Sequence, residues 1–170
     1  MSFTKILPDE IRDNVFRLIG DDWALITAGD QSALNTMTAS WGSMGVLWNK
    51  PVVHCFIRPQ RHTYSFVERH DTFTLSFFDE AYRQALKLCG TKSGRDTDKV
   101  ALCGFTPAFA ESGAPYFEEA RLVLVCKKLY SHDIQPARFV DRDVNAHYPQ
   151  NDYHREYVAE IVEVLMKTEE

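Results

Sequence analysis

Short apolar segments separated by turn residues recur along this chain, and their order constrains the fold more than any other feature. Alternating or β-branched runs of this length predict strands, and the Gly, Pro and Asn residues between them predict turns. Strands and helices do not alternate regularly, so successive strands should pair as an antiparallel meander. We predict strands at residues 23–28, 34–40, 46–48, 52–57, 73–78, 122–126 and 153–167, the last against a competing helical stripe.

Helices are expected in the connections. Pro8 in a first turn, acidic residues behind it and Gly20 as a stop predict an opening helix that covers the sheet. Further helices are predicted over residues 63–69, 80–88 and 96–102, with Thr63 as one N-cap and Asp96 as another. The predicted fold class is therefore mainly β with flanking helices, a small antiparallel barrel.

Length, charge and cysteine usage set further bounds. The 170 residues, 45% of them apolar, fit one domain spanning 1–170. A net charge of −5 argues against a nucleic-acid partner, which needs clustered Lys and Arg. No apolar run approaches the ~20 residues of a membrane-spanning helix, so no membrane partner is expected and we predict a soluble, cytoplasmic protein. The cysteines form no C-x-x-C pair and are expected to be buried free thiols: Cys55, Cys89, Cys103 and Cys126.

Several common catalytic motifs are missing from the sequence. It has no Gly-x-Gly-x-x-Gly, no Gly-x-x-x-x-Gly-Lys, no His-Glu-x-x-His and no Gly-x-Ser-x-Gly. His147 and His154 flank Asp152, but without a third ligand at a sensible spacing we favour hydrogen-bonded loop histidines over a metal site.

Three stretches are candidates for ligand binding. The small and hydroxyl residues of 35–42 would let a planar ligand approach the backbone, although a hairpin end with a packed Trp explains them as well. Residues 58–63 place two arginines beside a helix start, which suits a phosphate unless the arginines are simply solvated. Residues 92–99 form a basic loop that would be either a second wall of an anion site or a capped surface helix.

Taken together, the motifs resemble the flavin reductase-like, flavoredoxin-type proteins. The resemblance spans about residues 23–107. It rests on the segments 35–42, 48–51, 58–63, 73–78, 93–99 and 104–107, with a fainter echo in 153–161.

The resemblance implies an FMN-binding split barrel that works as a homodimer, with a flavin site on each side of the subunit interface. In this family the isoalloxazine ring would be lined by Asn35, Thr38, Ala39, Ser40 and Trp41. The ribityl phosphate would be held by Arg58, Arg61 and Thr63, with Ser93 and Lys99 completing the pocket. Phe77 would lie along the flavin, and no residue of 136–153 can be aligned.

The function implied is a reductase in which NAD(P)H delivers hydride to flavin N5, so no catalytic residue of the protein is obligatory. Two alternatives stay open: a non-enzymatic FMN electron carrier or redox sensor that works with an acceptor protein, and a barrel for another phosphate such as a pyridoxal-type ligand. We expect FMN in preference to FAD, because the phosphate site suits one phosphate. Trp41 and Trp48 lie near the predicted ring site, and the turn predicted at 42–45 should leave the flavin face open.

Overall fold

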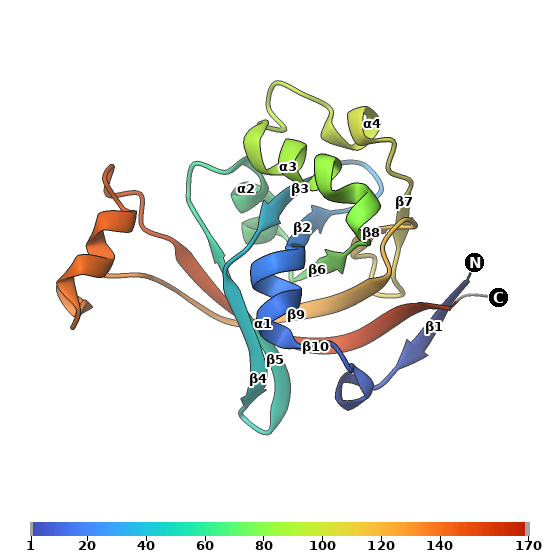
Figure 1. Cartoon of the computed structure of the whole chain (residues 1–170), viewed down its shortest axis with the longest axis horizontal. Helices are drawn as coiled ribbons and strands as arrows, with labels where there is room; N and C mark the ends of the chain where they lie inside the picture. The colour runs from blue at the N-terminus through green and yellow to red at the C-terminus, as the bar shows by residue number, and fades with distance from the viewer. Residues whose placement is uncertain (1, 169–170) are drawn as a thin grey trace.

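The computed structural model describes residues 2–168, and one curled antiparallel sheet of eight strands dominates it (Figure 1). The strand order is β3-β2-β6-β9-β10-β5-β4, and β1 pairs with the far half of β10. The strands are β1 Ser2–Ile6, β2 Ala24–Gly29, β3 Leu34–Ala39, β4 Gly42–Leu47, β5 Lys50–Ile57, β6 Thr72–Phe77, β9 Leu122–Asp133 and β10 Arg155–Thr168. The predicted fold class, mainly β with flanking helices, is confirmed.

The predicted meander is only partly right. The hairpins β2–β3, β4–β5 and β9–β10 join strands that are consecutive in the sequence, as a meander requires. However, β6 lies between β2 and β9, and β5 pairs with β10. The reason is helix α2, His62–Arg69, which packs on β2 and β3 and carries the chain away from β5 before β6 begins. The free edge of β5 is then covered by residues 155–160 of β10.

Two apolar clusters hold the sheet together from opposite faces. Neighbouring residues alternate between them: Ile26 belongs to the first cluster and Leu25 to the second. Met37 from one end of the sheet and Met44 from the other both pack on the first cluster, so the sheet curls around it. This two-residue period is the one that a strand imposes on its side chains.

The helical segments are short. They are η1 Pro8–Glu10, α1 Val15–Arg17, η2 Leu18–Asp22, α2, η3 Glu80–Tyr82, α3 Arg83–Thr91, α4 Lys99–Cys103, η4 Pro136–Arg138 and η5 Arg142–His147. A small hairpin, β7 Pro107–Phe109 and β8 Pro115–Phe117, stands apart from the main sheet. Within residues 2–168 no helix is long and apolar enough to cross a membrane.

Three helix predictions are wrong in detail. The continuous opening helix from Pro8 to Gly20 is instead one turn of 3-10 helix and a later helix, which begins after Asn14 because its side chain accepts hydrogen bonds from two backbone N–H groups. Helix α2 begins at His62, and its N-cap is Arg61, not Thr63. Helix α4 is capped by the Asp98 side chain, not by Asp96.

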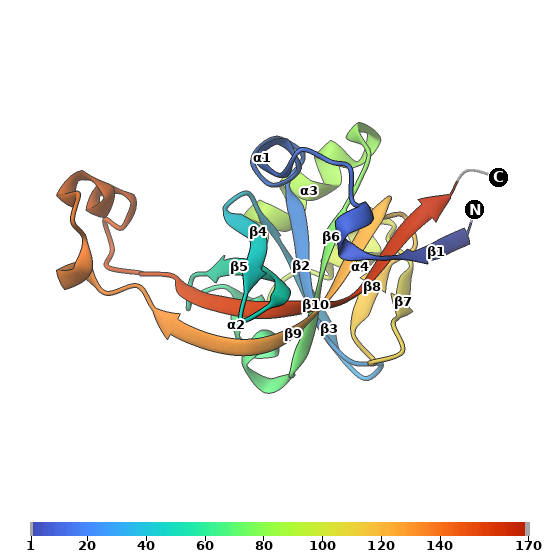
Figure 2. The ribbon, with the colours of Figure 1, turned by 90° about the horizontal axis from the view of Figure 1, so that it is seen from below.

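Residues 134–154, which we call the arm, join β9 to β10 and project from the body of the barrel (Figures 1 and 2). The arm carries η4 and η5. Its base lies beside the carboxyl end of β5, because β10 starts there in register with β5. The base of the arm therefore lies beside the segment that follows β5, which contains Arg58 and Arg61.

Candidate functional site

A cavity of about 250 Å³, the β3 cavity, lies where β3 ends. Four residues predicted to line a planar ligand, Thr38 to Trp41, all border it. The Thr38 hydroxyl donates to the Leu86 carbonyl of α3, which ties the strand end to that helix. The full lining is Met37, Thr38, Ala39, Ser40, Trp41, Phe56, Arg58, Arg61 and His154.

A second cavity of about 100 Å³, the α2 cavity, lies at the start of α2. Its lining is Gln60, Arg61, His62, Thr63, Thr91, Lys92, Ser93, Gly94 and Lys99. Because Arg61 borders both cavities, the two adjoin at its side chain. The structure thus brings together the segments that follow β5 and α3, which are about thirty residues apart in the sequence.

Two cations of the α2 cavity are held without a counter-charge. The buried Lys99 amine donates to the carbonyls of Thr36 and Cys89, and the Arg61 guanidinium donates to Gly90 O at 2.7 Å and Cys89 O at 3.2 Å. Neither makes an ion pair with a carboxylate among the described residues. Burial, together with the positive charge of nearby Arg61, lowers the pKa of Lys99 to about 8. Such a site gains stability when an anion enters.

The α2 helix start adds neutral donors to this cavity. The first backbone N–H groups of a helix have no partner inside the helix, and the helix dipole places positive potential there. Thr63 is fully buried, and its hydroxyl oxygen accepts a hydrogen bond from Asn35 Nδ2 at 2.7 Å, which leaves the hydroxyl proton free to donate elsewhere. Together with the two cations, these groups suit a phosphate.

Asn35 lies beside the start of α2 and does not border the β3 cavity, so its predicted place beside a planar ring stays a prediction that the cavity lining does not support. The reason is strand alternation: its side chain points toward α2. A Cβ atom on Gly94 would lie 1.9 Å from Asn35 Oδ1, so only glycine allows the 93–98 loop to approach this closely. Beyond that contact Asn35 borders a wider surface groove of about 720 Å³.

Arg58 borders the β3 cavity and does not reach the α2 cavity, so its predicted role at the phosphate is not supported by its position. Its guanidinium lies 2.7 Å from Asp152 Oδ2, donates to the His147 carbonyl at 3.0 Å and lies 4.9 Å from the centre of the Tyr148 ring. All three partners belong to the arm. Arg58 therefore anchors the arm over the β3 cavity.

The arm also supplies His154, which the sequence did not identify as a site residue. Its side chain is 8% exposed, borders the β3 cavity and is hydrogen-bonded through Nδ1 to the Tyr148 hydroxyl at 2.8 Å. Burial lowers the pKa of His154 to about 4, so the ring is neutral near pH 7. The predicted hydrogen-bonded loop histidine is present, and it faces the site as well.

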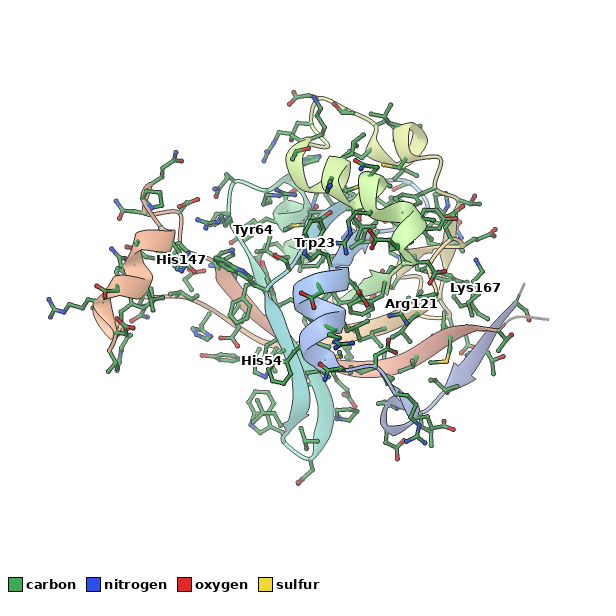
Figure 3. The ribbon with its side chains drawn as sticks, in the orientation of Figure 1. Trp23, His54, Tyr64, Arg121, His147 and Lys167 are labelled. Atoms are coloured by element: carbon green, nitrogen blue, oxygen red, sulfur yellow. The ribbon has the colours of Figure 1, made fainter. Side chains whose placement is uncertain are left out.

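Trp41 stands between the cavity and the arm. Its side chain is 48% exposed, and its ring centre lies 5.4 Å from those of both His147 and His154. His147 lies on the side of the arm that faces the sheet (Figure 3). Within residues 2–168, no group of three or more His, Cys, Asp or Glu side chains is arranged to hold a metal ion.

Phe77 is fully buried in the first core cluster and borders neither cavity, because its position in β6 points it into the barrel, so its predicted place along the flavin stays a prediction. One further prediction about the cavity is wrong. The segment 42–45 is not a flexible turn but the first part of β4, paired with β5. Trp48 lies at the far end of that hairpin, 6.5 Å from Tyr130 between ring centres, and does not border the β3 cavity.

The two adjoining cavities combine an anion site with a flat, partly apolar one. Small residues and the rings of Trp41, Phe56 and His154 border the β3 cavity, while the α2 cavity is lined mainly by polar and positively charged side chains, Arg61 and Lys99 among them. A ligand that suits both has a planar ring system at one end and a phosphate group at the other.

Comparisons with known proteins identify the family and the fold. Residues 16–170 match the family model described as the flavin reductase like domain. No curated protein matches the sequence.

Among solved structures, flavoredoxin of Desulfovibrio vulgaris is 24% identical with a TM-score of 0.67, the match covering 85% of this chain and 69% of that one. An FMN-binding domain of a flavin reductase-like enzyme from Shewanella baltica is 18% identical, covers 96% and 76%, and has a TM-score of 0.70. The Streptomyces globisporus NADH:FAD oxidoreductase SgcE6 is 18% identical, covers 89% and 80%, and has a TM-score of 0.66. At these identities the structural matches establish the split-barrel fold.

Proposed function

The chain belongs to the flavin reductase-like family, and from that premise we propose that it binds FMN and acts as an NAD(P)H-dependent flavin reductase-like oxidoreductase. The observation that carries the proposal is a pair of neighbouring cations, the half-buried Arg61 and the buried Lys99, neither of which forms an ion pair with a carboxylate among residues 2–168. A phosphate in the α2 cavity would supply the missing negative charge.

Each part of the chain has a defined role in this proposal. Arg61 and Lys99 bind the phosphate, and the Ser93 hydroxyl and the N–H groups at the α2 helix start complete its shell. Residues 38–41 and His154 border the ring. FMN, when bound, supplies the chemistry, since its N5 accepts a hydride from NAD(P)H and the electrons then pass to an acceptor.

The preference for FMN over FAD follows from the size of the α2 cavity. At about 100 Å³ it suits one phosphate group. The wider groove beyond Asn35 carries both signs of charge, with the carboxylates of Asp30, Asp96 and Asp98 beside the cations Arg95 and Lys99, so it lacks the one-sign character that favours a second phosphate. Equal affinities for FMN and FAD, measured by flavin fluorescence, would contradict this part of the proposal.

The test of the reductase activity is anaerobic mixing of the FMN-loaded protein with excess NADH and, separately, NADPH. Bleaching of the flavin absorption band within seconds by either nucleotide supports a reductase. No bleaching over many minutes, while dithionite still reduces the flavin, would contradict it. A spectrum of the purified protein, taken first, would show a pyridoxal-type ligand by its different absorption.

One feature favours the second candidate, an FMN electron carrier without turnover. The β3 cavity, about 250 Å³, is smaller than the ~300–1,000 Å³ of typical ligand sites, and the arm places His147 and His154 beside Trp41 at its mouth. If the mixing experiment shows no bleaching, the carrier remains, with an acceptor protein as partner.

We also propose that two copies of the chain, each a single domain spanning 1–170, form a homodimer. Strands β3 and β4 leave sheet edges open, and apolar surface is exposed by Val46 of β4, Trp48 of the β4–β5 turn and Tyr130 of β9. Sedimentation at micromolar concentration should show a dimer. A monomer with full flavin occupancy would refute an interfacial flavin site. Cytoplasmic location stays a prediction.

A further inference from the structure

Two thiols meet behind the α2 cavity. Cys89 of α3 and Cys103 of α4 are both free, and their sulfur atoms lie 3.8 Å apart. Cys89 is fully buried and Cys103 is half-buried. The other two cysteines, Cys55 and Cys126, are buried in the first core cluster. Only the α3–α4 pair therefore combines a short sulfur–sulfur distance with partial exposure of one member.

We propose that Cys89 and Cys103 are a redox modification site, in which a hydroperoxide oxidises the pair to a disulfide that slows release of a phosphate-bearing flavin from the α2 cavity. The effect on release rests on the proposed function, whereas the thiol chemistry does not. Hydrogen peroxide is a suitable oxidant, because reduced flavins generate it with oxygen.

The surroundings of the two thiols suggest the order of the chemistry. The Cys103 thiol lies 3.8 Å from the Ala85 carbonyl oxygen, so it can donate to that oxygen while its sulfur accepts from Cys89. A donor beside a sulfur atom favours its thiolate, and Lys99 adds positive charge nearby, although burial still raises the pKa of Cys103 overall. Burial raises the pKa of Cys89 to about 12. Cys103 is half-buried whereas Cys89 is fully buried, so Cys103 is the thiol that a peroxide reaches first.

The reaction balances in two steps. The Cys103 thiolate attacks one peroxide oxygen, so that an S–O bond forms, the O–O bond breaks, and the leaving oxygen takes a proton as water or an alcohol. The Cys89 sulfur then attacks the Cys103 sulfur: an S–S bond forms, the S–O bond breaks, and water leaves with the Cys89 proton. Two thiols lose two electrons in total, and the hydroperoxide gains them.

The bridge would act on the binding site through the backbone. The Cys89 carbonyl accepts hydrogen bonds from both Arg61 and Lys99. Lys99 begins α4, and Cys103 follows it by four residues, one helical turn away. A bridge from 89 to 103 closes the segment that contains Ser93 and Gly94, the outer wall of the α2 cavity. Local opening of that wall, which phosphate release requires, becomes rarer when its two ends are joined.

The test uses the whole protein, with and without FMN. After treatment with hydrogen peroxide, the intact mass should fall by about 2 Da, the two thiol hydrogens, and peptide mapping should find a Cys89–Cys103 bridge that dithiothreitol reverses. FMN release on dilution, followed by flavin fluorescence, should slow by about tenfold or more, while riboflavin release is unchanged.

Matched variants separate the pair from other effects. Cys103→Ser should lose both the mass change and the slower release, while Cys126→Ala should keep both. Absence of the bridge in the oxidised wild-type protein would overturn the proposal, and so would a bridge that leaves FMN release at the reduced-protein rate. A bridge in a protein that binds no flavin would confirm the thiol chemistry and refute the proposed function together with the effect on release.

Discussion

Lys99 is the most informative residue to change, because its charge is both buried and unbalanced. The side chain is only 4% exposed, and burial lowers the pKa from 10.5 to about 8. That difference corresponds to a free-energy cost of about 3 kcal/mol for keeping the amine charged in the ligand-free fold. Met matches Lys in length and carries no charge, so Lys99→Met removes the cation while filling the same space.

The variant should lose only the part of the FMN affinity that the phosphate group contributes. A hydrogen bond to a charged group contributes ~1.5–3 kcal/mol, so Lys99→Met should weaken FMN binding roughly 10- to 150-fold. Riboflavin has the same ring system without the phosphate, and its affinity should stay nearly unchanged. Lys87→Met is the matched control, because Lys87 is exposed on α3 and borders neither cavity.

The same residue predicts a pH dependence. Because a bound phosphate stabilises the charged amine, the pKa of Lys99 is higher in the complex than in the free protein, where it is about 8. FMN affinity of the wild type should therefore fall as pH rises above about 8, by at most tenfold per pH unit. Lys99→Met should lack this fall, and riboflavin should show none in either protein.

Stability of the ligand-free protein should change in the opposite direction. The folded pKa of Lys99, about 8, is below the ordinary value of 10.5, so between these values the unfolded chain binds more protons than the folded one. The free energy of unfolding should rise with pH across this window through the Lys99 contribution. Fluorescence titrations of both flavins and urea unfolding measure the two effects. An equal loss of FMN and riboflavin affinity, or an FMN-to-riboflavin affinity ratio independent of pH, would refute the assignment of Lys99.

Three further changes test other parts of the site. Arg61→Ala should weaken FMN binding roughly 10- to 150-fold and leave riboflavin nearly unchanged, and similar losses for both would mean that Arg61 does not contact the phosphate. Gly94→Ala would place a methyl group 1.9 Å from Asn35 Oδ1, so FMN titration should show weaker binding, and wild-type affinity would contradict the close approach of the 93–98 loop. Asp152→Ala removes the carboxylate that pairs with Arg58, so limited proteolysis should cut the arm faster than in the wild type, and an unchanged rate would mean that this pair does not hold the arm. FMN at ~100 times its dissociation constant should add about 2.7 kcal/mol to the free energy of unfolding, which calorimetry would detect as a higher melting temperature.

The fold class could be predicted because a strand is marked in the sequence by a local, two-residue alternation of side chains. Leu34 and Met37 lie on opposite faces of β3, as their alternation indicates, and the final segment is a strand even though its apolar residues also suit a helix. No local pattern in the sequence indicates the order of the strands in the sheet. The edge of β5 is covered by residues about one hundred positions later, and only the path of α2 explains why β6 does not take that place.

The candidate site divides in the same way. Residues 38–41 and the Arg61 to Thr63 segment are each continuous in sequence, so their residue types alone indicate a flat shelf and an anion-binding helix start. The sequence does not say which charges remain unbalanced. Arg58 and Arg61 are alike as residues, yet Asp152 on the arm neutralises the first, and the second shares the Cys89 carbonyl with a buried Lys99. Local preferences depend on neighbours in sequence, whereas the electrostatic state of a side chain depends on neighbours in space, so only the tertiary structure decided which cations are available to a phosphate.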